Sequence, residues 1–342
     1  MKPHEPRVSV IVVAHNAERE IGAALASLSA QTFQEFEVLV IDDGSTDDTM
    51  ERVQRHPDPR VRVARHGERR GTALAWQAAL QLARGDIVAL LDADACALPQ
   101  RLALQVAALD ADPALQLVGS HLALAGCGDI WRRPPQPEAA AAELLVRDCL
   151  SGVTLRRRAW PADEPCLLPA AHAYWLNARV AASGKVANID RVLTRVRLPA
   201  TQPTRGRQVL YESCMREVMR EQIRRLGIEP SERELTLNRH IGAYTLPSSA
   251  QLLYEVEAWL LKLFLANCDS RRYPEPAFAR MIGREWYEVC KFAAPLGAEA
   301  LQIWRASPLL KHWQPSVPER LRFIAKCLLR HERAGNGTAA LA

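Results

Sequence analysis

Apolar runs and helical periodicities alternate along the first 120 residues of the chain. An uninterrupted apolar run covers residues 8–14, and apolar residues follow it at helical spacing at Ile21, Ala24, Leu25 and Leu28. The same succession predicts strands at 37–41, 61–64, 85–94 and 115–119, and helices around Met50 and Val53, at 72–83 and at 101–109. Strands that alternate with helices of this length are typical of βαβ units around a parallel sheet.

Beyond residue 120 the pattern becomes less regular and then mainly helical. A Gly- and Pro-rich stretch at 126–137 predicts a loop. The residues after it predict, in order, a helix at 138–148, a strand at 152–155, a helix at 170–183 and a strand at 187–189. From there on helices are predicted at 208–226, 231–241, 248–267, 276–294, 297–306 and 317–332. We expect an α/β fold, a Rossmann-like nucleotide-binding domain with a mainly parallel sheet, followed by a helical C-terminal region and a disordered tail at 334–342.

Composition places the chain among soluble globular proteins, with 342 residues, 48% of them hydrophobic and 24% charged. No run approaches the roughly 20 apolar residues that a membrane-spanning helix needs. Residues 1–7 lack the apolar core of a signal peptide, so we expect a cytoplasmic protein. The eight cysteines show no spacing typical of a zinc or redox site.

Positive charge is concentrated near the C-terminus. The whole chain carries +5, which is modest for its size and does not indicate nucleic acid as a partner. Residues 305–342 contain seven Lys or Arg and two Glu, so this segment alone carries the same net charge. Within it, residues 317–333 form a basic amphipathic helix whose apolar face is Leu321, Ile324, Ala325, Leu328 and Leu329. Two interpretations stay open: peripheral contact with the inner face of an anionic membrane, or docking of this face on the domain.

Two acidic pairs each follow a predicted strand. Asp92 and Asp94 end the apolar run at 85–94, and they would point the same way if the strand continued. Two carboxylates at the carboxyl edge of such a sheet suit Mn²⁺ or Mg²⁺, which would carry the phosphates of a nucleotide, although an ordinary acidic turn has the same sequence. Asp42 and Asp43 end another strand, and could accept hydrogen bonds from a base or ribose. The first strand-to-helix turn lacks Gly-x-Gly, which argues against a Rossmann oxidoreductase.

Five ordered motifs between residues 8 and 94 resemble those of family 2 glycosyltransferases. They are Val8 to Asn16, Ser27 to Phe33, Val40 to Asp47, Ala83 to Asp86, and Leu91 to Asp94, the last a DxD motif. The resemblance implies a GT-A fold at residues 1–200, with a donor half at 8–120 and an acceptor half at 121–200, before the helical region at 201–333. It implies metal-dependent, inverting transfer from a nucleotide sugar, such as a UDP-sugar, to a glycan or lipid-linked acceptor of a cell-surface polysaccharide.

The resemblance also assigns roles to individual residues. Asp43 would contact the base, in a pocket lined by Asp42 and the loop from Val13 to Asn16. Asp92 would face the ribose or donor sugar, and Asp94 would coordinate the metal. The implied donor-binding residues are Val13, His15, Asn16, Asp42, Asp43, Arg69, Gly71, Asp92 and Ala93, and the implied metal ligands are Asp94 and Asp92.

The catalytic base of the family has no equivalent in this sequence. The family usually has a Glu-Asp pair where this chain has Ala170, Ala171 and His172. His172 is the nearest replacement, because imidazole titrates near neutral pH; Asp163 and Glu164 are further candidates. Arg156 or Arg158 would help to stabilise the departing diphosphate. The alternative function is a catalytically silent relative that binds a nucleotide sugar or a partner protein.

Overall fold

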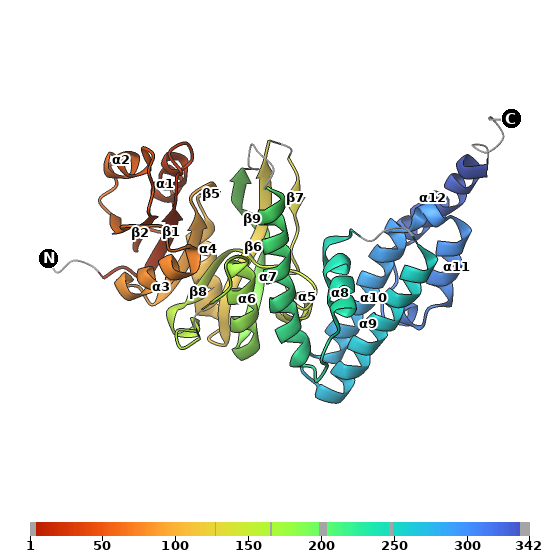
Figure 1. The fold of residues 1–342 in the computed structure, drawn as a ribbon. Coiled ribbons are helices and arrows are strands. Elements are labelled where there is room, and N and C mark those ends of the chain that lie inside the picture. Colours follow the sequence, from red (N-terminus) through yellow and green to blue (C-terminus); the bar gives the residue numbers. More distant parts are fainter. Residues whose placement is uncertain (1–4, 127, 165, 198–203, 246–248, 336–342) are drawn as a thin grey trace. The chain divides into compact units, whose positions relative to one another are not determined.

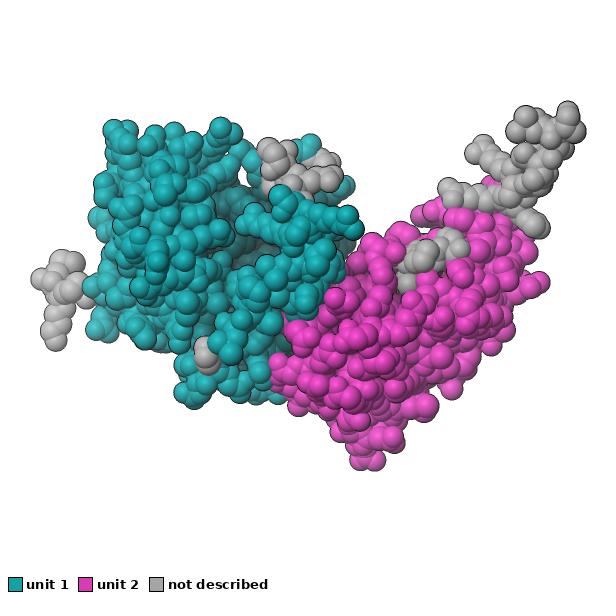
Figure 2. Space-filling model, viewed as in Figure 1, with its two compact units in different colours: residues 1–141, 148–214 teal, residues 142–147, 215–342 magenta. Residues whose placement is uncertain are grey.

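The computed structural model describes residues 5–126, 128–164, 166–197, 204–245 and 249–335, without the side chains of 330–335. The chain forms two compact units (Figure 2). Unit 1 contains residues Met1–Ala141 and Asp148–Cys214, and unit 2 contains Ala142–Arg147 and Met215–Ala342.

Unit 1 is built on one mixed sheet, with the strand order β3-β2-β1-β4-β8-β6-β9-β5 and β7 paired to β6 (Figure 1). Strands β3, β2, β1 and β4 run parallel, whereas β8 is antiparallel to both of its neighbours. The strands are β1 (Val8–Ala14), β2 (Phe36–Asp43), β3 (Val61–His66), β4 (Ile87–Asp92), β5 (Ala95–Ala97), β6 (Leu115–Ala125), β7 (Ile130–Trp131), β8 (Ser151–Arg156) and β9 (Lys185–Arg197).

Helices cover both faces of the parallel half of this sheet. Residues of α1 (Ile21–Ser29) and α4 (Arg101–Ala111) share one apolar cluster with alternate residues of β1, β2 and β4. The apolar residues of α3 (Thr72–Leu82) are not part of that cluster, although α3 contacts β1 and β2, so α3 covers the opposite face. Unit 1 also contains α2 (Thr49–Gln54), the 3₁₀ turn η1 (Arg157–Ala159) and α6 (His172–Ser183), while α5 (Pro137–Glu143) and α7 (Arg205–Arg224) continue into unit 2.

Unit 2 is helical and has its own core. Its helices are α8 (Glu232–Ala243), α9 (Ala250–Ser270), α10 (Glu275–Phe292), α11 (Ala298–Ala306) and α12 (Val317–Gly335), with the short turns η2 (Ala294–Leu296) and η3 (Pro308–Lys311). The core contains the buried rings of Phe278, Trp286 and Trp304. Glu285 is also fully buried, and it forms ion pairs with Arg147 and Arg284 that hold its pKa below the ordinary value despite the opposing effect of burial. Paired in this way, a buried carboxylate remains charged in the core.

The predicted α/β fold followed by a helical region is confirmed, and several boundaries need correction. Strands β5 and β7 were not predicted, and β7 lies inside the predicted loop at 126–137. Strand β9 is 13 residues long, whereas only three residues were predicted. A bulge near residue 190 interrupts the alternation of polar and apolar residues, so the sequence pattern does not show the full strand. The helix predicted at 138–148 ends at Glu143. Helix α12 extends to Gly335, so most of the predicted tail, 336–342, lies outside the described residues.

Among the described residues, no helix is both long and apolar enough to cross a membrane.

Candidate active site at the carboxyl edge of the sheet

The two acidic pairs lie on either side of the end of β1. In the sheet, Ala14 is in register with Asp42 on β2, and Val13 is in register with Asp92 on β4. Neighbouring strands are about 4.8 Å apart, so the ends of β2 and β4 are separated by roughly 10 Å. The turn with His15 and Asn16 leaves β1 between them. The sheet thus brings the predicted donor-binding residues of three strands to one edge.

Asp43 is buried and fully engaged with the loop that follows β3. Its Oδ1 accepts a hydrogen bond from the Arg70 N–H (2.8 Å) and lies 3.0 Å from Nδ1 of His66. Its Oδ2 accepts from the Gly71 N–H at 2.8 Å. Burial opposes ionisation, but these hydrogen bonds outweigh it and hold the pKa of Asp43 below its ordinary value. Asp43 is therefore a charged carboxylate, and its hydrogen bonds fix the loop at 66–71.

Asp42 and its neighbours join the first two strand-to-helix turns. The Asp42 Oδ1 accepts from the Ser45 N–H at 3.0 Å, and its Oδ2 lies 2.9 Å from Nε of Arg65. The Asn16 N–H donates to Oγ of Ser45, while the Asn16 side-chain oxygen accepts from the Thr46 N–H. Asn16 has a φ of 50°, a left-handed conformation that Asn tolerates better than most residues.

His15 lies against the end of β2, and Gly44 lets the turn after β2 approach the loop at 66–71. The Nδ1 atom of His15 lies 2.9 Å from the Asp43 carbonyl oxygen. Gly44 has a φ of +73°, and a Cβ there would lie 2.7 Å from the Arg69 nitrogen, so only glycine permits this approach. Gly71, at φ +93°, then begins α3. The Arg69 side chain is exposed beside these backbone contacts.

Asp92 and Asp94 lie in different surroundings from the buried pair. Both are exposed, and neither forms a hydrogen bond or ion pair with another described residue. Strand β4 ends at Asp92, and Ala93 and Asp94 form a turn before β5. Asp92 is exposed to water but has many protein atoms around it. The resulting desolvation of its carboxylate and the negative charge of Asp94 raise the pKa of Asp92, and the positive charge of Arg101 opposes this. Desolvation also raises the pKa of Asp94.

This donor set fits a divalent cation that also binds phosphate. Two neighbouring carboxylates with raised pKa values gain from a positive charge placed between them. No group of three or more His, Cys, Asp or Glu able to hold a metal is found among the described residues. Asp92 and Asp94 would therefore hold Mn²⁺ or Mg²⁺ only together with substrate phosphates and water, as is usual for Mg²⁺.

His172 begins α6 and packs against α3. Its Nε2 lies 2.9 Å from the Leu168 carbonyl oxygen, and its ring meets the ring of Trp76 edge-on, 6.2 Å between centroids. A carbonyl only accepts, so Nε2 carries the proton and Nδ1 holds the lone pair in the neutral ring. Burial lowers the pKa of His172, and the bond to Leu168 only partly opposes this. Near pH 7 the ring is therefore neutral, with a basic nitrogen at Nδ1.

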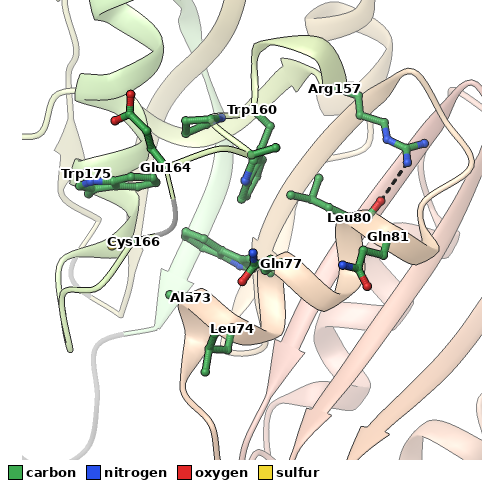
Figure 3. Close-up of a pocket in the computed structure, with 13 residues that line it drawn as sticks. Ala73, Leu74, Gln77, Leu80, Gln81, Arg157, Trp160, Glu164, Cys166 and Trp175 are labelled. Carbon is green, nitrogen blue, oxygen red and sulfur yellow. Dashed lines mark hydrogen bonds between the residues drawn. The ribbon is translucent and has the colours of Figure 1, made fainter.

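A pocket rich in tryptophan lies between α3, the segment after η1, and α6 (Figure 3). His172 is next to it through its ring contact with Trp76, one of the lining residues. The pocket has a volume of about 290 Å³, and Trp76, Trp160 and Trp175 line it together with Gln77 and Glu164. Glu164 points to the rim and forms an ion pair with Arg179 at 2.8 Å. Asp163 is exposed in the same segment and is not one of the lining residues.

The suggested role of Arg156 or Arg158 at the diphosphate needs correction. Arg156 is in register with Ile87, at the start of β4, whereas Asp92 is at its end. Five residues of strand separate these positions by about 16 Å. The Arg156 guanidinium donates to the Leu115 and Leu109 carbonyl oxygens, and Arg158 follows in η1, so both residues belong to the opposite edge of the sheet.

Two residues that organise the site were not predicted from the sequence. His66 holds Asp43, and Arg101 lies fully buried behind β4, where it donates to the Leu90 carbonyl oxygen at 2.6 Å. Burial lowers the pKa of Arg101 to about 10, and the charge of Asp92 opposes this. For Arg101 the sequence contains one signal: a charged residue in the first turn of α4, a helix that otherwise packs on the sheet.

Residues 9–172 match the family model "Glycosyl transferase family 2". An uncharacterized glycosyltransferase of Haemophilus influenzae is 27% identical over 64% of this chain and 73% of its own length. The Escherichia coli enzyme WfgD, named as a UDP-Glc:α-D-GlcNAc-diphosphoundecaprenol β-1,3-glucosyltransferase, is 35% identical, but the match spans 29% of this chain and 39% of that enzyme.

The fold is similar to that of a solved structure over most of the chain. TarS 1–349 of S. aureus, crystallised in complex with UDP-GlcNAc, superposes with a TM-score of 0.53 and 17% sequence identity, covering 89% of this chain and 91% of that one. This likeness concerns the fold, which is of the GT-A type.

Proposed function

This chain belongs to glycosyl transferase family 2 through its N-terminal unit, and from that premise we propose that it is a metal-dependent inverting glycosyltransferase. It would move a sugar from a nucleotide sugar, with UDP-sugars as the first candidates, to a glycan or lipid-linked acceptor in polysaccharide synthesis. The names of the relatives support this substrate class, because WfgD is named for a UDP-glucose donor and a diphosphoundecaprenol-linked acceptor.

The observation that carries the proposal is the contrast between the two acidic pairs at one sheet edge. The Asp42 and Asp43 side chains hold the turns that follow the strands, while Asp92 and Asp94, at the same edge, have carboxylates without a hydrogen-bond partner among the other described residues. Open α/β sheets bind their ligands at this edge. A divalent cation bound by Asp92 and Asp94 would neutralise the diphosphate and stabilise it as it leaves.

Donor contacts are assigned to the ordered turns. We assign the base to the space lined by Val13, His15 and Asn16, next to Asp43. Both oxygens of Asp43 already accept hydrogen bonds, so a contact with the base would use the remaining lone pair of Oδ2. Arg69, Gly71 and Ala93 border the same space, and the exposed Arg69 side chain is free to face the phosphates.

The acceptor is assigned to the tryptophan pocket beside His172. Nδ1 of His172 would take the proton of the attacking hydroxyl, while the bond between the donor sugar and the diphosphate breaks and the diphosphate leaves with the bonding electrons. A base with a pKa below 6.5 is deprotonated at neutral pH and ready to accept a proton. Apolar ring faces and a few polar groups give the pocket the composition of a small-molecule site.

The test is release of the nucleoside diphosphate from a panel of nucleotide sugars with Mn²⁺, comparing wild type with Asp94→Ala and His172→Ala. Wild type should turn over one donor, and Asp94→Ala should lose that turnover. Asp269→Ala, an exposed aspartate of unit 2, is the matched control and should behave as wild type.

The silent alternative predicts a different result from the same panel. UDP would bind with metal, no donor would be turned over with any acceptor, and Ala171→Asp would create activity by restoring a carboxylate at the family's position. NADH binding would instead indicate an oxidoreductase. Donor turnover that is independent of Asp94 would show the metal assignment to be wrong.

A further inference from the structure

Helix α12 packs on the rest of unit 2 through a different face from the apolar face that its sequence predicts. Phe323 and Cys327 are buried, and Phe323 packs edge-on against Tyr287 and Trp304 at 5.7 and 5.4 Å between centroids. Most of the predicted apolar face stays in water: Leu321, Leu328 and Leu329 are 59%, 53% and 64% exposed, and only Ile324 is partly buried. Docking of the helix therefore does not explain why these leucines are there.

Positive charge borders the exposed leucines. At 100° per residue, Leu321, Leu328 and Leu329 form one arc of the helix, and Arg322 and Lys326 follow at its edge, next to Leu329. Lys326 also lines a hollow of about 240 Å³ together with Lys291 and Phe292. Lys291 pairs with Glu288, whereas Lys326 forms no ion pair with a described residue. A half-exposed Phe292 continues the apolar surface beside these ammonium groups.

We propose that α12 binds the surface of an anionic lipid membrane through the face that carries the three exposed leucines, Arg322 and Lys326. Leucine side chains would enter the boundary between head groups and acyl chains, while Arg322 and Lys326 would meet lipid phosphates. A second copy of the chain is a poorer partner, because the same cations would face each other across a two-fold interface. The proposed function gives this contact a purpose, since a lipid-linked acceptor is confined to the membrane; the contact itself rests on the residues of α12 and the neighbouring end of α10.

The experiment is co-sedimentation of the full chain with vesicles, without donor or acceptor. Binding should be strong to vesicles with 30 mol% phosphatidylglycerol (about one anionic lipid in three), weak to pure phosphatidylcholine, and weaker as salt rises. Leu321→Gln/Leu328→Gln/Leu329→Gln should reduce partitioning at least about tenfold, because the variant removes most of the buried apolar area. Arg322→Gln/Lys326→Gln should reduce it roughly tenfold at low salt.

Leu265→Gln is the matched control, since Leu265 is 60% exposed on α9 and should bind vesicles as wild type does. Circular dichroism checks that the variants fold, which we expect because the replaced side chains face water. Equal binding by wild type and the leucine variant would overturn the proposal, as would a dimer in solution that the leucine variant disrupts. Sugar transfer to a detergent-solubilised acceptor is measured separately, so failure of the proposed function and failure of membrane binding are distinguishable.

Discussion

The two acidic pairs at the ends of β2 and β4 have similar sequences and opposite environments. Asp42 and Asp43 are buried, and protein donors hold them. Asp92 and Asp94 are exposed and have no hydrogen-bond partner among the other described residues. The pKa of Asp43 is lowered, whereas those of Asp92 and Asp94 are raised. A carboxylate that the protein has satisfied supports the fold, and one that it has left unsatisfied is available to a ligand.

The largest expected effect is loss of activity in Asp92→Asn or Asp94→Asn with little loss of stability. Removing an electrostatic contact to the leaving group costs roughly 10²–10³ in rate. The free energy of unfolding should stay within about 0.5 kcal/mol of wild type in Asp94→Asn, whose side chain holds no other described residue. Asp92→Asn also removes the negative charge that faces buried Arg101, and should lose up to about 1 kcal/mol. Transfer assays and urea unfolding measure the two quantities. A stability loss above about 1 kcal/mol would place Asp92 or Asp94 with the structural pair.

The next effect concerns the proposed proton acceptor, His172, which belongs to neither acidic pair. His172→Gln should lower kcat about 100-fold if His172 is the base. Because burial lowers its pKa, kcat/KM of wild type should rise with pH only below about pH 6.5, and stay constant from pH 7 to 8. The variant should lack that rise. A rise that persists in the variant, or one centred above pH 7, would exclude His172 as the base.

Asp43→Asn should show the reverse of the result expected for Asp94→Asn, because its main effect is a loss of stability. An amide cannot accept from the Gly71 N–H with its NH₂ group, and hydrogen bonds to charged groups contribute about 2–3 kcal/mol. Since folding lowers the pKa of Asp43, its contribution is fully present above the unfolded value of about 3.9 and is lost as the pH falls toward the folded value. The difference between wild type and variant in urea should therefore be constant from pH 5 to 8 and shrink in acid.

The parallel half of the fold was predictable mainly because β1, β2 and β4 are buried on both faces and appear as apolar runs. Strand β5 was not, since its three residues become a strand only by pairing with β9, far along the chain. The positions of both acidic pairs followed from their strands. Their different roles did not, because the partners of Asp43 come from the loop at 66–71, whose charged sequence predicts only a solvated turn. Buried Arg101 was hidden for a related reason: charge in a first helical turn usually faces water.

The smallest expected effect tests whether Asp42 and Asp43 support donor binding through the loop at 66–71. In Gly44→Ala the new Cβ would lie 2.7 Å from the Arg69 nitrogen and the Glu68 carbonyl carbon, at a φ of +73° that alanine disfavours. We expect a loss of about 1–2 kcal/mol of stability and a higher KM for the donor, with kcat less affected.

Gly67→Ala is the matched control, because a Cβ at Gly67 meets no atom within 4 Å and the backbone there is ordinary for L-residues. It should stay within about 0.5 kcal/mol of wild type. Urea unfolding and donor titration distinguish the two variants. If Gly44→Ala bound the donor as tightly as Gly67→Ala does, the turn and the loop would not form the donor pocket, and Asp43 would have a role in stability alone.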